Sequence, residues 1–267
     1  AFKYCKSLKS ISIPNNVTSI GDYAFWGCNS LASINIPDNV TSIGYGAFLG
    51  CDSLTNINIP DNVTSIGDDA FKYCKSLKSI SIPNNVTSIG DYAFSDCKSL
   101  TSINIPDSVT SIGVHAFDNC TSLRSIIIPS NVVAIDGNPF CGCHADLFNE
   151  SKAFVCEENV LFNKDKTTLI SYRAKGTNYI IPDTVTSIGI YAFSGCKSLQ
   201  SINIPNSVTN IGECAFFNCN SLTNINIPKS VTSVGEDAFS GCNSLRFGLR
   251  SEFIHRFGSK VYKSWRL

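Results

Sequence analysis

Cysteine is the residue type with the most chemical potential in this chain, which contains 13 of them. Such a number could form a disulfide framework, hold metal ions or provide nucleophiles. Ten of the cysteines share one constant spacing, which is regular on either side of a single gap between Cys143 and Cys196. These ten are Cys5, Cys28, Cys51, Cys74, Cys97, Cys120, Cys143, Cys196, Cys219 and Cys242.

Each of these ten cysteines lies between a recurring Phe and a recurring Leu, which is a core position of a repeat. We therefore interpret them as buried free thiols that act as small hydrophobic side chains. Thiols stacked in a row come close to one another, but parallel side chains rarely reach the disulfide torsion of about ±90°. We expect neither a disulfide framework nor a metal array from them.

A second cysteine group lies outside this regular spacing or at its end, and consists of Cys141, Cys143, His144 and Cys156. A Cys₃His zinc site, a disulfide from Cys141 to Cys156, and free thiols are all open for this group. Free thiols are the main interpretation, because the Cys-x-Cys-His cluster lacks the usual two-residue spacer and Cys143 continues the regular series. The sequence thus predicts no metal and no cofactor.

Catalytic residues are not evident. The only histidines are His115, His144 and His255, and no serine or cysteine has a recurring acid or base partner in its repeat. Residues of a repeated block are also presented several times, whereas a catalytic site needs unique neighbours. We expect that the protein is not an enzyme.

The spacing of the cysteines belongs to a longer 23-residue pattern, A-F-x-x-C-x-S-L-x-x-I-x-I-P-x-x-V-T-S-I-G-x-x, which recurs along the chain. Residues 1–25 are identical to residues 70–94, which lie three periods further on, and this identity indicates block duplication. A period of this length is typical of a solenoid, in which each repeat buries its apolar face against its neighbours.

One repeat can be divided into elements. Residues 33–36 alternate polar and apolar side chains, as a half-buried strand does, and Pro37 ends the strand. Asp38 and Asn39 are turn residues, and residues 40–43 form a second short extended segment. After Gly44, residues 47–51 fit a short helical or 3-10 segment.

The pattern Leu-x-x-Ile-x-Ile-Pro-x-x-Val-x-x-Ile-Gly-x-x-Ala-Phe resembles the BspA-like leucine-rich-repeat family, over residues 1–245 apart from one insert. The resemblance implies a repeat solenoid of leucine-rich-repeat type, with short parallel β-strands, short helical or 3-10 turns and one β-hairpin insert. It also implies an extracellular or cell-surface protein that adheres to proteins or glycans of a host, a matrix or other cells. The family offers no catalytic residues to transfer.

The domain organisation follows from where the pattern holds. Residues 1–245 are the solenoid, interrupted by an insert at about residues 141–178 that contains a β-hairpin over residues 159–172. Residues 246–267 form a basic tail with six Lys or Arg and one Glu, in which Phe253, Phe257, Val261 and Trp265 recur at every fourth position. We expect the tail to cap the stack; a membrane-surface or partner helix and a disordered end are the alternatives.

The outward side of the main strands is the predicted ligand-binding face. It carries small amides and hydroxyls without aromatic or arginine anchors, and so favours many weak contacts along its length. The alternative is that these side chains only keep the sheet soluble. The predicted positions are Ser12, Asn35, Asn58, Ser81, Asn104, Ile127, Asn203 and Asn226.

Ile127 departs from this polar row, and Val133 and Ala134 replace the Thr-Ser pair of most repeats. An apolar patch of this kind is usually covered. We expect the insert that follows to fold over it, and a ligand site there is the alternative.

The charge composition and the hydropathy of the chain argue against two classes of partner. Lys plus Arg equals Asp plus Glu at 21 each, so nucleic acid is not an expected partner, and no apolar run is long enough to cross a membrane. The chain begins in mid-repeat without Met, so we expect a fragment of a longer protein. An intracellular, cytoplasmic scaffold is the alternative function, because cysteines in oxidising compartments are usually paired.

Asn-x-Thr or Asn-x-Ser sequons are glycan acceptors in a eukaryotic secretory pathway, which is the alternative interpretation of these sites. They begin at Asn16, Asn39, Asn62, Asn85, Asn119 and Asn149. Repeat consensus is the main interpretation, because Asn is a turn former and the Val that follows it is a core residue.

Overall fold

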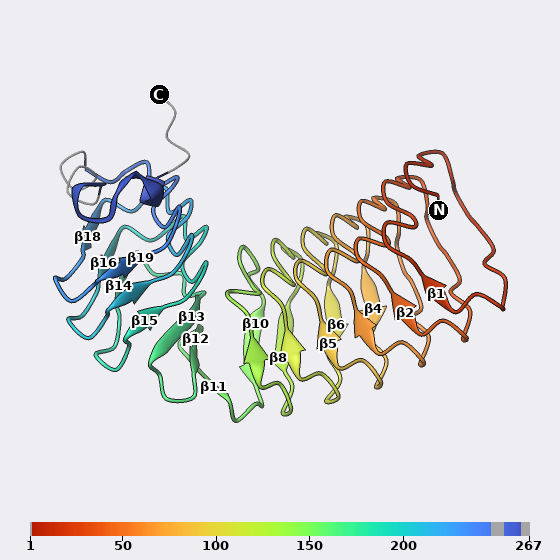
Figure 1. The fold of residues 1–267 in the computed structure, drawn as a ribbon, viewed down its shortest axis with the longest axis horizontal. Coiled ribbons are helices and arrows are strands. Elements are labelled where there is room, and N and C mark those ends of the chain that lie inside the picture. The colour runs from red at the N-terminus through yellow and green to blue at the C-terminus, as the bar shows by residue number, and fades with distance from the viewer. Residues whose placement is uncertain (1, 247–253, 263–267) are drawn as a thin grey trace. The chain divides into compact units, whose positions relative to one another are not determined.

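The computed structural model describes residues 2–246 and 254–262. They form a parallel β-solenoid in which each 23-residue repeat makes one coil, so the predicted fold class is confirmed. The chain divides into two compact units, which we call the N-terminal unit (Ala1–Ala153) and the C-terminal unit (Phe154–Leu267). Figure 1 shows the coils of each unit stacked one beside the next.

The N-terminal unit has two rows of parallel strands, one for each extended segment of the repeat. The second segments form a six-stranded parallel sheet, and the first segments pair as short strands or isolated bridges. The six-stranded sheet is β1 (Ser19–Ile20), β2 (Ser42–Ile43), β3 (Ser65–Ile66), β5 (Ser88–Ile89), β7 (Ser111–Ile112) and β9 (Ala134–Ile135). The first row contains β4 (Ser79–Ser81), β6 (Ser102–Asn104), β8 (Ser125–Ile128) and β10 (Asp146–Asn149).

The C-terminal unit repeats both rows but begins with antiparallel strands. β12 (Val160–Asn163) and β13 (Thr168–Tyr172) pair as the expected hairpin, and β11 (Phe154–Glu157), which the sequence analysis did not predict, adds a third antiparallel strand. β13 then pairs in parallel with the first regular coil. The remaining strands are β15 (Ser187–Ile188), β17 (Asn210–Ile211) and β19 (Ser233–Val234) in one row, and β14 (Asn178–Ile180), β16 (Ser201–Asn203) and β18 (Asn224–Asn226) in the other.

The segment from Gly to Cys of each repeat consists of successive tight turns rather than one continuous helix. In residues 21–28, alternate N–H groups donate to carbonyls three residues earlier, as in a 3-10 turn, and the others donate to carbonyls of the next coil. The first set is Ala24, Trp26 and Cys28, and the second is Tyr23, Phe25 and Gly27. Left-handed residues such as Tyr23 (φ 55°) and Gly27 (φ 70°) interrupt the helical path, which is why no helix continues here.

The core is a set of ladders in which identical side chains stack from coil to coil. The rings of Phe48, Phe71 and Phe94 are fully buried and nearly parallel, with centroids 5.4 and 5.5 Å apart. Each cysteine thiol beside them donates a hydrogen bond to the Phe carbonyl of the preceding coil, as Cys97 does to Phe71 at 3.2 Å. Stacking therefore removes the apolar rings from water and gives each buried thiol a hydrogen-bond acceptor.

Backbones of neighbouring coils approach closely at the recurring glycine. A Cβ atom built on Gly90 would lie 2.6 Å from the backbone nitrogen of Asp68, whereas one built on Gly21, in the same sequence context, would meet nothing within 4 Å. Glycine is thus required wherever another coil precedes it in the stack.

The described part of the tail covers the last coil of the C-terminal unit. Val261, in the 3-10 helix η1 (Ser259–Tyr262), is fully buried in the core of this unit. The Arg256 guanidinium donates to the carbonyls of Ile227, Pro228 and Val231 at 2.9–3.1 Å. Residues 254–257 are helical, while Phe253 and Trp265 of the predicted apolar stripe lie outside the described residues.

Candidate functional site

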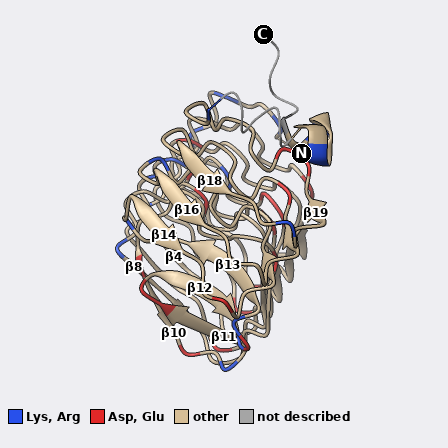
Figure 2. Ribbon diagram, turned by 90° about the vertical axis from the view of Figure 1, so that its left-hand side faces the viewer, with Lys and Arg blue, Asp and Glu red and all other residues tan. Residues whose placement is uncertain are grey.

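The predicted strand face lies on the solvent side of the first strand row, and all eight predicted residues are exposed. The parallel register keeps equivalent side chains adjacent, as in the pairs Ser12–Asn35 and Ser81–Asn104 of the N-terminal unit and Asn203–Asn226 of the C-terminal unit. Figure 2 shows that most of these strands carry no charged residue. The strand face is therefore a regular, neutral, polar surface.

The apolar patch on this face is not covered, contrary to expectation. β10 pairs in register with β8, which places Phe148 opposite Ile127. Ile127 is 46% exposed, Phe148 is 56% exposed and Val133 is 69% exposed. The insert fails to fold over the patch because its first residues continue the solenoid as one more parallel strand, whose outward position is itself apolar.

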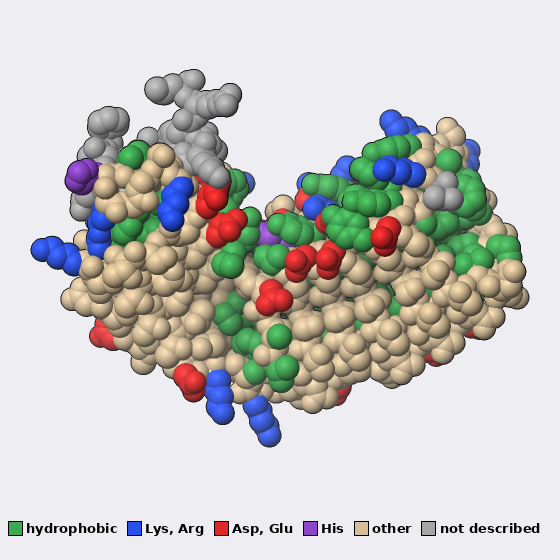
Figure 3. Space-filling model, viewed as in Figure 1, with side chains coloured by type: hydrophobic (Ala, Val, Ile, Leu, Met, Phe, Trp, Pro, Cys, Tyr) green, Lys and Arg blue, Asp and Glu red, His purple; other side chains and the backbone are tan. Residues whose placement is uncertain are grey.

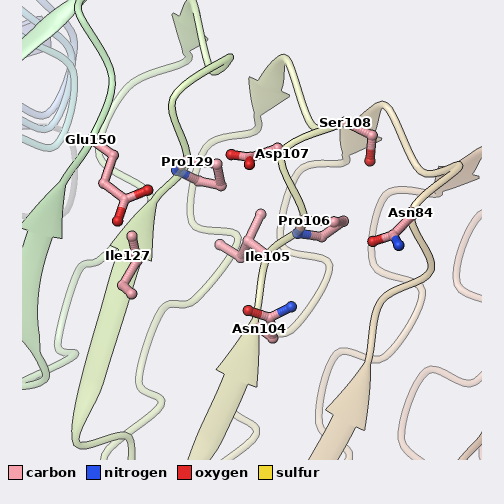
Figure 4. A pocket seen from close by; sticks show the side chains of 9 residues that line it. All are labelled: Asn84, Asn104, Ile105, Pro106, Asp107, Ser108, Ile127, Pro129 and Glu150. Carbon is pink, nitrogen blue, oxygen red and sulfur yellow. The ribbon is translucent and has the colours of Figure 1, made fainter.

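A shallow hollow of about 540 Å³ lies beside this patch (Figure 4). Ile127 and Asn104 from the strands line it, and the carboxylates of Asp107 and Glu150 stand at the turns. The hollow combines apolar side chains with acceptor groups and is open to solvent, which suits a peptide or protein surface better than a deeply enclosed small molecule.

A second surface of the N-terminal unit is chemically richer, and we call it the turn face. It consists of the side chains that project from the Gly-to-Cys turns of successive coils, where Figure 3 shows hydrophobic, basic and acidic side chains gathered. Its members are Lys3, Tyr4, Tyr23, Trp26, Tyr45, Asp69, Lys72, Tyr73, Tyr92, Asp96, His115, Asp118 and Cys141.

One end of the turn face is an aromatic cluster. Trp26 packs against Tyr4 and Tyr23 with ring centroids 4.8 and 4.9 Å away, and Tyr23 packs against Tyr45 at 5.0 Å. The Lys3 ammonium lies 4.0 Å from the Trp26 ring centroid. Because the rings pack on one another, the cluster is already assembled without a ligand.

The middle of the turn face is polar and charged. Lys72 forms an ion pair with Asp69 at 2.8 Å, and its ammonium lies 4.1 Å from the Tyr92 ring centroid. A side-chain hydrogen bond to Asp69 raises the pKa of Tyr45, which links this group to the aromatic cluster. Tyr92 in turn stacks on His115 at 4.9 Å. Neighbouring coils thus connect their turn residues into one continuous stripe.

The regular cysteines are structural thiols rather than reactive groups. Their predicted burial is confirmed for most of the series, although Cys5 is exposed and Cys196 is half-buried. Burial raises the pKa of Cys51 to about 12 and that of Cys97 well above its ordinary value, so these groups stay protonated. Since the thiolate is the reactive form, they are poor nucleophiles.

The zinc site considered for Cys141, Cys143, His144 and Cys156 does not form. Within the described residues, the group whose ligand atoms come together is His115, Asp118 and Cys141, which takes only Cys141 from that set. Cys143 is buried in the core and His144 is exposed, because neighbours along the chain face opposite sides of the coil wall.

The sequon asparagines that follow proline have a structural role. The Nδ2 groups of Asn39, Asn62 and Asn85 donate to a backbone carbonyl of the preceding coil at 2.6–2.7 Å. The hydrogen bond gives these asparagines a role in the repeat that is independent of any glycan.

The turn face was not predicted as a surface from the sequence. Its signal was present, since the positions after Gly and after Ala-Phe vary among otherwise near-identical repeats. The left-handed residues of the turns determine which of these side chains point to the same side of the coil. The 23-residue pattern does not give the direction of a side chain in a turn.

Comparison with known proteins supports the fold and the family. The family model described as BspA type leucine rich repeat region (6 copies) matches residues 1–121, 87–172 and 170–267. The chain belongs to the BspA-type leucine-rich repeat family. No curated protein matches it significantly.

Solved structures of bacterial proteins are similar to this member of the family. A leucine-rich repeat protein from Eubacterium ventriosum is 34% identical over 82% of the chain, with a TM-score of 0.73, and the chain spans 59% of that protein. A leucine rich cell surface protein from Faecalibacterium prausnitzii is 35% identical over 89% of the chain and 74% of that protein, with a TM-score of 0.69. The pneumococcal vaccine antigen PcpA, at 22% identity, shares the fold, with a TM-score of 0.65 over 89% of the chain and 71% of that protein.

Among the residues described, no helix is long and apolar enough to cross a membrane.

Proposed function

We propose that this BspA-type repeat protein is a non-enzymatic, surface-exposed adhesion protein that binds other proteins on a host cell, a matrix or a neighbouring cell. The family and the cell-surface protein from Faecalibacterium prausnitzii support this role. The single observation that carries it is the aromatic turn face, because tyrosine and tryptophan on a rigid support are the side chains that dominate protein interfaces.

The packing of the aromatic cluster favours a protein partner over a glycan. Sugars stack on open ring faces, but the Trp26 ring has Tyr4 and Tyr23 against it and the Lys3 ammonium at 4.0 Å. Tyr4 and Tyr45 remain 52% and 39% exposed for a partner. Such groups combine apolar contact with hydrogen bonding.

The strand face contributes a weaker, extended contact in this proposal. Its exposed serines and asparagines offer one or two hydrogen-bonding groups per coil, and Ile127 with Phe148 supplies an apolar anchor. Repetition along the coils then gives avidity without a single strong contact.

Binding of the purified chain to immobilised extracellular-matrix proteins, to epithelial cells and to a glycan array tests the proposal. Tyr4→Asn with Tyr73→Asn removes two exposed rings while keeping a residue that tolerates the left-handed backbone, as Asn119 does at the equivalent position. We expect saturable protein binding that this pair weakens at least tenfold, with Asn58→Ser as the matched strand-face control that changes it little. Binding to glycans alone, or protein binding that the pair leaves unchanged, would contradict the proposal.

The intracellular scaffold is the second candidate, because all 13 cysteines are free thiols in the structure. Thiols normally persist in reducing compartments, although burial also protects them. Protease treatment of intact source cells followed by immunoblotting separates the two: loss of the protein places it on the surface, and its survival places it inside.

A further inference from the structure

A group of three potential metal ligands lies on the turn face of the N-terminal unit, away from the aromatic cluster. His115 and Asp118 come from one coil and Cys141 from the next, and their ligand atoms all lie within 4.8 Å of one another. The His115 Nδ1 atom is 3.9 Å from the Asp118 Oδ2 atom. Two adjacent coils therefore bring together a nitrogen, an oxygen and a sulfur donor that the sequence places in consecutive repeats.

The backbone fixes the relative position of the two coils at this point. The His115 N–H donates to the Asn138 carbonyl at 3.1 Å, and the Asn119 N–H donates to the Cys141 carbonyl at 2.8 Å. The imidazole also stacks on the Tyr92 ring at 4.9 Å with an interplanar angle of 19°. The donors thus stand on rigid supports and can move only by side-chain rotation.

The surroundings favour ligation over a simple ion pair. His115 is 5% exposed and Cys141 is 9% exposed, so both donors are largely shielded from water. Burial lowers the pKa of His115 to about 4, which leaves the imidazole neutral and able to coordinate. Asp96 and Lys72 add opposite charges nearby, and Lys72 is already paired with Asp69.

Comparison among the repeats shows that this combination occurs once among the described coils. In the other described coils, the positions equivalent to His115, Asp118 and Cys141 hold at most one good zinc ligand in each set of three. These sets are Tyr23/Trp26/Leu49, Gly46/Leu49/Lys72, Asp69/Lys72/Ser95, Tyr92/Ser95/Asp118, Tyr191/Ser194/Phe217 and Cys214/Phe217/Ser240. The His-Asp-Cys set is therefore a local departure from the duplicated pattern rather than a consequence of it.

We propose that His115, Asp118 and Cys141 bind one zinc ion. Zinc accepts nitrogen, oxygen and thiolate ligands together at about 2.0–2.3 Å, and tetrahedral coordination then separates neighbouring donors by about 3.3–3.6 Å. The 3.9 Å between the His115 nitrogen and the Asp118 oxygen exceeds the separation of a nitrogen–oxygen pair on zinc by about half an ångström. The other donor pairs, which lie within 4.8 Å, close by up to about 1.3 Å, and side-chain rotation provides these movements. Binding displaces the thiol proton of Cys141, and the cation offsets the partly buried Asp118 carboxylate. Three protein ligands leave a fourth position for water or a partner's side chain.

Titration of the reduced, metal-free protein with Zn²⁺ and with Co²⁺ tests this site. We expect one Zn²⁺ per chain, a rise in melting temperature on binding, and a thiolate-to-cobalt charge-transfer band in the Co²⁺ spectrum. Cys141→Ser should abolish that band, and His115→Tyr and Asp118→Ser should each weaken Zn²⁺ binding at least tenfold.

The repeats provide variants that are expected to fold, because each introduced residue already occupies the equivalent position of another coil: Tyr92 for His115, and Ser95 for both Asp118 and Cys141. Cys156→Ser is the control, since it removes a half-buried thiol from the other unit and should leave binding intact. No binding at 100-fold molar excess of Zn²⁺ would overturn the proposal. So would binding that the three variants leave unchanged, whatever Cys156→Ser does.

Discussion

The duplicated block provides a controlled test of how much stacking contributes to stability. Phe2 and Phe71 lie at the same position of two identical 25-residue sequences, so local propensity is the same for both. Phe71 is fully buried between Phe48 and Phe94, whereas Phe2 is 41% exposed and stacks on Phe25 alone. Replacing each by alanine therefore compares one residue in two different stacking environments.

The expected difference follows from buried area and ring contacts. A fully buried Phe→Ala substitution costs about 3–5 kcal/mol, which we expect for Phe71→Ala. If a phenylalanine side chain buries about 200 Å², the 41% exposure of Phe2 leaves about 80 Å² in water, or about 2 kcal/mol less to lose. One ring neighbour instead of two removes about 0.5–1.5 kcal/mol more. We expect Phe2→Ala to cost about 1 kcal/mol, and at most about 2.5 kcal/mol.

Urea unfolding followed by circular dichroism measures both free energies, and a nearest-neighbour analysis accommodates partial unfolding of coils. The wild-type and both variants are compared at one pH and temperature. If the two substitutions cost the same free energy within experimental error, the coils do not derive their stability from stacked neighbours, and the account of the core given above is refuted.

Three further predictions concern other parts of the chain. Burial raises the pKa of Cys51 from 9.0 to about 12, so between these pH values the folded state keeps a proton that the unfolded state has released. The free energy of unfolding should therefore fall as the pH rises from 9 to 12. In urea titrations at several pH values, Cys51→Ala should make this decrease smaller by about 1.4 kcal/mol per pH unit. Gly90→Ala should destabilise by about 1–3 kcal/mol through its close approach to the preceding coil, while Gly21→Ala in the identical sequence should change stability little, as calorimetry can check. Arg256→Ala should lose three hydrogen bonds to the last coil and accelerate hydrogen exchange there, and an unchanged exchange rate in the C-terminal unit would contradict the capping role.

The sequence predicted the stacked elements well, because stacking makes each position repeat. The two strand rows and the buried thiols follow from the 23-residue period and the alternation of polar and apolar side chains. Strand β11 was missed because it belongs to the insert, where the period gives no information. Phe148 was missed as an exposed residue because β10 continues the parallel stack without the repeat pattern.

The candidate sites were harder to predict, for a reason that lies in the turns. A strand alternates its side chains between two faces, so Asn35 and Asn58 could be assigned to solvent from sequence alone. The Gly-to-Cys turns alternate between right-handed and left-handed residues, and His115 itself has a φ of 56°. Only the resulting path shows that His115 and Cys141, which belong to consecutive repeats, face the same point.

Stacking of duplicated coils favours the same side chain at equivalent positions, whereas a specific binding site needs different side chains. In this structure the two requirements fall on different positions of the repeat. Core ladders hold side chains of similar size and shape, because each must fill the space beside the equivalent side chain of the next coil, as the Phe48, Phe71 and Phe94 rings do. The turn positions keep their backbone through hydrogen bonds between coils, and they hold Tyr, Gly, Asp, His and Cys in different repeats. Specific chemistry can therefore change on the turn face without a cost to stacking, and we expect substitutions there to alter binding far more than stability.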